Sequence, residues 1–275
     1  MKKNLILLLL FAALADNKGQ AKLEIFPDNL NIQPFTANSL EPKLGFLFQL
    51  SKNELELDIG NSIDILKLTE KEKTFSFGAD MFTYTLLRGE QHFHFPVDAV
   101  DYLFGVNFGF KSQTDNGEYG CRLRISHISA HFVDGHYDGI DQMWRDGLNP
   151  RVYSREFVEF MPYYKLNDLR VYCGFTYLFH VDPGYIKKDN YQAGFDYFFK
   201  GLLNESFTPF IGYDLKFEHI ARYTANNSLS AGIKLGRPEG KGLSLYFNYY
   251  SGKSIHGEYF DFNKEYSAIG INLDL

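Results

Sequence analysis

The sequence predicts an all-β protein, an antiparallel transmembrane β-barrel of about 12 strands, within a range of about 10 to 14. Three observations lead to this prediction. Apolar and polar residues alternate with period two through almost the whole chain after residue 41. Aromatic residues make up 17% of the chain, with 27 Phe and 19 Tyr. No segment after the N-terminal region is apolar enough to cross a bilayer as a helix, so an integral membrane protein would have to be a barrel.

The first residues have the pattern of a secretory signal peptide. Lys2 and Lys3 precede an apolar run that ends in the small-x-small sequence "ALA" at 13–15. At about eleven residues, this run is too short for a transmembrane helix, which needs roughly twenty. We therefore expect a signal peptide at 1–15, a periplasmic N-terminal segment at 16–41 and an outer-membrane barrel at 42–275.

The alternating segments that follow are the predicted strands. They lie at about 44–50, 55–59, 74–87, 102–110, 119–129, 151–164, 171–179, 191–199, 211–217, 229–235, 243–249 and 269–275. In the third segment the alternation changes phase near Met81, which predicts a bulge. Small and polar residues occupy the face opposite the apolar one, as at Gly105, Asn107 and Gly109. A lipid-facing barrel with a polar lumen gives this pattern, and a soluble sandwich or lipocalin-like barrel reads the same way locally.

Connection lengths favour the membrane barrel, in which short periplasmic turns alternate with long external loops. Short connections are predicted at 69–73, 111–118, 165–168, 200–206 and 236–242, and long ones at 88–100, 130–150, 180–190, 218–228 and 251–264. Only the short connection at 51–53 breaks the alternation. The last strand, "YSAIGINLDL", resembles the terminal strand that the barrel-insertion machinery reads, although it ends in Leu275 rather than an aromatic residue. These features predict the outer membrane of a Gram-negative bacterium.

The charge and cysteine content exclude other classes. A formal net charge of -6 argues against a nucleic-acid partner, which would require a basic surface. The two cysteines, Cys121 and Cys173, lie on different predicted strands and form no disulfide framework. We therefore expect outer-membrane lipids as the surroundings and partners of this chain.

One strand end carries residues with catalytic potential. In "GCRLRISHISAH" at 120–131, His127 and Ser129 continue the apolar face of Leu123. The predicted topology directs this strand outward, so both residues would face lipid near the outer leaflet, with Glu156 on the next strand at a similar height. A serine becomes a nucleophile when an imidazole takes its proton and a carboxylate orients that imidazole. The alternative interpretation is a polar, hydrogen-bonding strand end without activity.

The His-x-Ser pair resembles that of outer-membrane phospholipase A and the outer-membrane lipid A deacylases. Those enzymes carry such a pair on the lipid-facing side of a barrel strand near the outer leaflet. The resemblance implies Ser129 as nucleophile, His127 as base, and Glu156 or Asp141 as the residue that orients the base. It is limited to the pair and its barrel context, and the chain departs from those enzymes at Ala130, where they have Asn.

A broader resemblance covers most of the chain. The segments "IQPFTANSLEPKLGF", "RLRISHISAHFVDG", "YSREFVEFMPYY" and "SGKSIHGEYFDFNKEYSAIGINLDL" are similar to an uncharacterised bacterial family, domain of unknown function 1207. That family implies an envelope protein rich in β-structure and offers no established activity.

Two classes of function are therefore compatible with the sequence. The first is a non-catalytic barrel with a structural, small-pore or surface-binding role, its lumen lined by Asp196, Asp214, Lys216 and Lys234. The second is a serine-dependent lipid acyl hydrolase in which a homodimer or bound Ca²⁺ completes the oxyanion site. Asp134 and Asp138, in the external segment "HFVDGHYDGID", offer hard oxygen ligands for Ca²⁺, although such Asp-Gly runs are commonly solvated turns.

Overall fold

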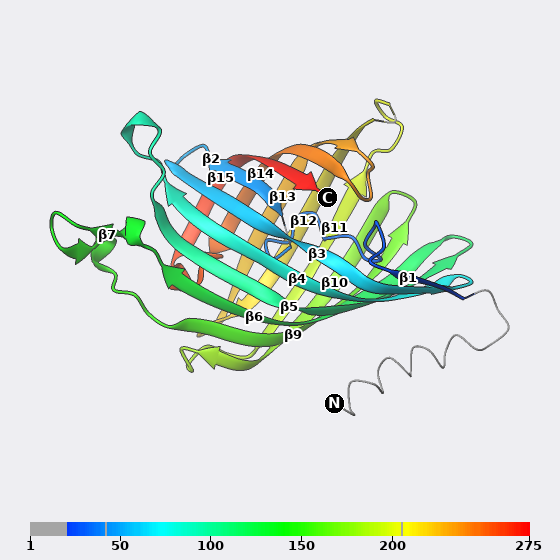
Figure 1. Cartoon of the computed structure of the whole chain (residues 1–275), viewed down its shortest axis with the longest axis horizontal. Coiled ribbons are helices and arrows are strands. Elements are labelled where there is room, and N and C mark those ends of the chain that lie inside the picture. Colours follow the sequence, from blue (N-terminus) through cyan, green and yellow to red (C-terminus); the bar gives the residue numbers. More distant parts are fainter. Residues whose placement is uncertain (1–20, 42, 205) are drawn as a thin grey trace.

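The computed structural model describes residues 21–41, 43–204 and 206–275 and has a closed antiparallel barrel (Figure 1). Its sheet has 13 strands, of which β1 (Lys22–Ile25) pairs only with the end of β3, so twelve strands make up the wall. The predicted signal peptide lies outside the described residues. Within those residues, no helix is both long and apolar enough to span a bilayer.

The wall strands follow one another around the barrel in chain order. They are β2 (Leu44–Gln49), β3 (Glu54–Glu70), β4 (Lys73–Arg88), β5 (Val97–Thr114), β6 (Gly117–Phe132), β9 (Tyr153–Leu166), β10 (Leu169–Asp182), β11 (Asp189–Phe198), β12 (Phe207–His219), β13 (Tyr223–Gly236), β14 (Gly242–Lys253) and β15 (Asn263–Asp274). The short β2 pairs with both β3 and β15 and closes the ring. The predicted all-β barrel of about 12 strands is confirmed.

The two faces of each strand are oriented as predicted. On β6, Arg122 and Arg124 point inward and are almost fully buried, whereas Ile125 points outward and is 40% exposed. Apolar and aromatic side chains cover the outer face, while polar and charged side chains occupy much of the interior. This inversion of a soluble protein's pattern is typical of a barrel surrounded by lipid.

The predicted bulge near Met81 is wrong. Met81 continues the outward face of β4 and is 76% exposed, and the register with β5 is regular there. The apparent change of phase arises because inward residues Phe82 and Tyr84 are themselves apolar. The irregularity in this hairpin lies instead on β3, between Asp64 and Leu66.

The wall has a short-turn end and a long-loop end. The short-turn end is formed by the connections at 71–72, 115–116, 167–168, 199–206 and 237–241. The long-loop end is formed by the connections at 89–96, 133–152, 183–188, 220–222 and 254–262. The connection between β12 and β13 is much shorter than predicted, because most of residues 218–228 extend the two strands. Small elements occur in the loops: η2 (Gln91–Phe93), η3 (Asp134–His136), β7 (Tyr137–Asp138), β8 (Met143–Trp144), η4 (Arg145–Gly147) and η5 (Gly257–Tyr259).

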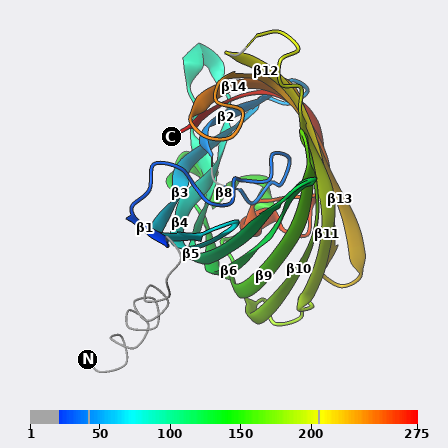
Figure 2. The same cartoon turned by 90° about the vertical axis from the view of Figure 1, so that its right-hand side faces the viewer.

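Residues 26–41, which we call the inserted segment, run from β1 into the barrel (Figure 2). Phe35 and Asn38 are fully buried there. The Arg170 guanidinium donates to the carbonyl oxygens of Gln33 and Pro34 at 2.9 and 2.6 Å, which fixes the segment to β10. Part of the predicted periplasmic segment is thus packed within the lumen, an arrangement that its irregular, non-alternating sequence did not indicate.

Two layers fill the lumen beyond this segment. A buried charge network, composed of Glu41, Asp80, Arg122, Arg124 and Glu159, crosses its middle. An apolar outer cluster lies toward the long-loop end and includes Phe82, Tyr84, Leu103, Ile128, Tyr153, Phe157, Leu178 and Phe260. Packed side chains therefore occupy the middle of the lumen and its long-loop half.

Candidate functional site

The long-loop end of β6 presents the predicted His-x-Ser pair on the outer face of the barrel. His127 and Ser129 are half-buried and lie on the same side as Ile125. The ring of Phe104 on β5 lies 4.9 Å from the imidazole of His127, measured between ring centroids. This contact restricts the orientation of the imidazole on a surface that otherwise faces lipid.

Glu156 on β9 is the direct register partner of His127. Its carboxylate oxygen Oε1 lies 2.6 Å from Nδ1 of His127, with both side chains about one quarter exposed. A carboxylate that accepts the Nδ1–H bond leaves Nε2 as the basic nitrogen of the ring. The structure therefore brings together two of the predicted site residues in the arrangement required of an oriented base.

Glu156 also contacts a second imidazole, which the sequence pattern did not identify. His180 on β10 places Nδ1 at 2.5 Å from Oε2 of Glu156, and its own Nε2 lies 3.7 Å from Asp182. An irregularity between Leu178 and His180 shifts the register of β10 against β9. Because of this bulge, His180 joins the outer face instead of pointing into the lumen. The sequence signal was the adjacent pair Phe179 and His180, which breaks the alternation.

Ser129 lies opposite Ser154 of β9, and both side chains are on the outer face. Side chains directly opposite on antiparallel strands have Cβ atoms about 4.5–5.5 Å apart. The hydroxyl group of Ser154 is therefore within reach of a molecule bound at Ser129. The outer face of β6, β9 and β10 thus presents the hydroxyl groups of Ser129 and Ser154 and an imidazole that is oriented by Glu156.

The structure does not bring Asp141 to His127. Asp141 lies between β7 and β8, where it lines a cavity of about 520 Å³ together with Asp138 and Trp144. Glu156, rather than Asp141, therefore occupies the third position beside the histidine.

The predicted calcium ligands Asp134 and Asp138 lie in the connection between β6 and β9. The carboxylate of Asp138 accepts the N–H groups of Ile140 and Asp141, which lowers its pKa, and it lies 3.6 Å from Arg145. Asp134 is the first residue of η3. In the ranges that the structure describes, no group of three or more His, Cys, Asp or Glu residues could hold a metal ion.

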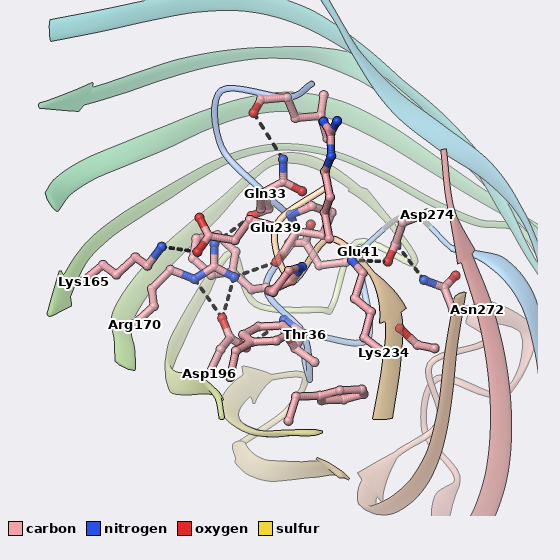
Figure 3. A pocket seen from close by; sticks show the side chains of 18 of the residues that line it. Gln33, Thr36, Glu41, Lys165, Arg170, Asp196, Lys234, Glu239, Asn272 and Asp274 are labelled. Atoms are coloured by element: carbon pink, nitrogen blue, oxygen red, sulfur yellow. Dashed lines mark hydrogen bonds and ion pairs between the residues drawn. The ribbon is translucent and has the colours of Figure 1, made fainter. Parts of the chain in front are cut away.

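The predicted lumen residues are each held by protein partners. Asp196 accepts hydrogen bonds from Arg170 and from the N–H of Thr36, and Lys234 lies 2.6 Å from Asp274 (Figure 3). Asp214 accepts from Tyr172 and Gln192, and Lys216 donates to Asn38. The lumen therefore contains a connected polar network. Arg122 and Arg124 were not among the predicted lumen residues, although the alternation in "RLR" at 122–124 places them on the inner face.

A cavity of about 340 Å³ lies in the short-turn half of the barrel, between the inserted segment and the wall. Phe198, Phe210 and Tyr246 form an aromatic side of it, and the ion pairs of Lys165 with Glu239 and Arg170 with Asp196 form a polar side (Figure 3). The cavity faces inward, so it is separated from the outer-face histidines by the barrel wall.

Comparisons with known proteins agree with this fold. The model of a family described as "protein of unknown function (DUF1207)" matches residues 100–275. Outer membrane phospholipase A from Escherichia coli has a similar structure, with a TM-score of 0.54 and 14% identity over 89% of this chain and 94% of that one. The β-domain of the Bordetella autotransporter BrkA gives a TM-score of 0.43 and 11% identity over 84% and 97% of the two chains. No curated protein matches in sequence.

Proposed function

Because this chain belongs to the DUF1207 family, which is described only as being of unknown function, we propose an activity from its site: hydrolysis of lipid acyl esters on the outer face of an outer-membrane barrel. The single observation that carries this proposal is the 2.6 Å contact between His127 and Glu156, two residues along the strand from Ser129. A phospholipid or lipid A molecule beside the wall would present its ester groups near the membrane interface, where these side chains lie.

The roles of the residues follow from their chemistry. Nε2 of His127 takes the proton of Ser129 as Oγ attacks the ester carbonyl carbon, and Glu156 stabilises the resulting imidazolium. The tetrahedral intermediate collapses when His127 returns the proton to the leaving alcohol. Water then hydrolyses the acyl-serine by the same base. The hydroxyl of Ser154 is our candidate donor to the oxyanion.

The similar fold of outer membrane phospholipase A supports the proposal only at the level of the barrel, since the two chains share 14% identity. Another similar solved structure is that of an active-site mutant of the same enzyme, so a barrel of this kind can carry an active site. The activity of this chain rests on its own residues.

A non-catalytic barrel is the second candidate. Its support is the packed lumen, in which the inserted segment, the buried charge network and the apolar outer cluster follow one another. That packing favours a structural or surface-binding role over a small pore.

The test is release of fatty acid from labelled phospholipid and lipid A by refolded protein in detergent with Ca²⁺ present. We expect Ser129→Ala and His127→Ala to lower the rate by about a thousandfold or more, as loss of a nucleophile or base does. Ser267→Ala, another outward-facing serine on β15, is the matched control and should retain the rate. Folded wild-type protein without activity on either lipid would contradict the proposal.

A further inference from the structure

A group of basic side chains at the long-loop end has no role in the proposed hydrolysis. Lys187 and Lys188 lie between β10 and β11, and Arg222 lies between β12 and β13. The N–H of Lys187 donates to the carbonyl oxygen of Ile220 at 3.2 Å, so the two connections are in contact. All three basic residues are exposed. We call them the basic rim patch.

The basic rim patch differs from four other cations near the long-loop end, which are paired with carboxylates. Arg88 pairs with Asp98, Arg145 with Asp138, Arg151 with Asp261 and Lys264 with Glu54. In contrast, within the described part of the chain, no carboxylate lies within ion-pairing distance of the three patch residues. Their charges are therefore available to a molecule outside the protein.

The nearest carboxylate along the chain already has other partners. Asp189 lies 3.0 Å from Nδ1 of His219 and accepts a hydrogen bond from the hydroxyl of Tyr223. Asp182, at the end of β10, faces His180 at 3.7 Å. Neither carboxylate pairs with a lysine or arginine of the patch, so the outward positive charge is retained.

Exposed aromatic residues indicate the depth of the patch in the membrane. Tyr177, Tyr191 and Tyr223 face outward on β10, β11 and β13, and each is more than 40% exposed. Rings of tyrosine mark the interface between acyl chains and headgroups on barrel proteins. Lys187, Lys188 and Arg222 lie in the connections just beyond these strand ends, which is the level of the lipid headgroups.

We propose that the basic rim patch binds the phosphate groups of a phosphorylated glycolipid of the lipid A type in the outer leaflet. Lysine and arginine are the side chains that recognise phosphate, and the patch has three of them without internal partners. Acyl chains of the same lipid would lie against the aromatic outer face below. The proposal does not rest on the hydrolase, because binding requires no nucleophile.

The experiment uses the full chain with Ser129→Ala, so that no lipid can be consumed, in a neutral detergent. Binding of diphosphoryl lipid A is measured by native mass spectrometry for this protein and for the triple variant Lys187→Ala, Lys188→Ala, Arg222→Ala. Each cation near a lipid surface contributes about fivefold in affinity, so we expect about a hundredfold loss in the triple variant. Mobility shift on heating in gels verifies that each variant is folded.

The matched control removes the same charge at the opposite end. Lys71, Lys73 and Lys241 are exposed residues of the short-turn end, and their triple alanine variant should bind diphosphoryl lipid A like the parent. Equal binding by the patch variant and the parent would overturn the proposal. So would equal binding of dephosphorylated lipid A. Saturable binding of inorganic phosphate with the same affinity would show an ion site and not a lipid site.

Discussion

At the scale of single residues, Glu156 has the central position on the outer face because it joins imidazoles from two different strands. Its two oxygens contact His127 on β6 and His180 on β10. One carboxylate between two imidazoles is held in a fixed rotamer from both sides. Its orientation therefore does not depend on a bound lipid.

Replacing Glu156 tests this arrangement. Glu156→Ala should lower kcat of ester hydrolysis by about a hundredfold or more, because His127 loses the group that orients it and stabilises its cation. Glu156→Gln should lose less, since the amide oxygen can still accept the Nδ1–H bond. His180→Ala leaves the His127 contact in place and serves as the control. Full activity of Glu156→Ala in a lipid release assay would remove Glu156 from the site.

At the scale of elements, Glu41 fixes the inserted segment to the wall. Its carboxylate accepts hydrogen bonds from both terminal nitrogens of Arg122, at 2.7 and 2.5 Å, and all atoms of this pair are buried. Arg124 lies 3.6 Å away and also contacts Asp80. Two buried guanidinium groups therefore depend partly on a carboxylate that comes from outside the strands.

Removing that carboxylate should be costly. We expect Glu41→Ala to lower the free energy of unfolding by about 3–5 kcal/mol, because it removes the carboxylate that binds both terminal nitrogens of the buried Arg122 and leaves that cation only its contact with Glu159. The measurement is guanidinium unfolding of the refolded barrel in detergent, followed by tryptophan and tyrosine fluorescence. Glu72→Ala, at an exposed turn, should change the midpoint little. A midpoint for Glu41→Ala equal to that of wild type would disprove the role of this contact.

The turn between β13 and β14 should respond to acid. Burial raises the pKa of Glu239, but hydrogen bonds from Lys165 and Lys200 outweigh it and lower this pKa from 4.5 to about 2. Because the pKa of Glu239 is lower in the folded state, its ionised carboxylate stabilises the folded turn above pH 4.5. This stabilisation is lost as the pH falls toward 2 and the carboxylate becomes protonated. The difference in melting temperature between wild type and Glu239→Gln should therefore shrink over that interval. A difference that is constant with pH would contradict the pairing.

At the scale of the whole molecule, the two layers of side chains inside the barrel should prevent ions from crossing the lumen. The buried charge network and the apolar outer cluster lie one above the other across the lumen. We expect wild-type protein in planar bilayers to show no stepwise ion conductance, in contrast to a water-filled barrel. Reproducible conductance steps from the purified protein would show that the layers do not seal the lumen.

Much of this architecture could be predicted because each strand of a barrel wall has a local alternation of outward apolar and inward polar residues. The strands, their faces and the pairing of His127 with Glu156 all follow from period two and from neighbouring strands in register. Two features were missed because they are not local. His180 reaches the site only through a bulge on β10, and Glu41 meets Arg122 across 81 positions of sequence. The pair Phe179 and His180 breaks the alternation but does not identify Glu156 as a partner, and the irregular segment that contains Glu41 has no periodic pattern.

The position of residues 26–41 also has a consequence for the order of events during biogenesis. This stretch precedes every wall strand in the chain, yet its partners Arg122, Arg170 and Asp196 belong to strands from β6 to β11. The ring closes where β2 meets β15, the first and last wall strands. A ring that closed early would leave its arginines facing an empty interior, at a high cost in free energy. We therefore expect the inserted segment to be in contact with the later hairpins before the seam between β2 and β15 forms.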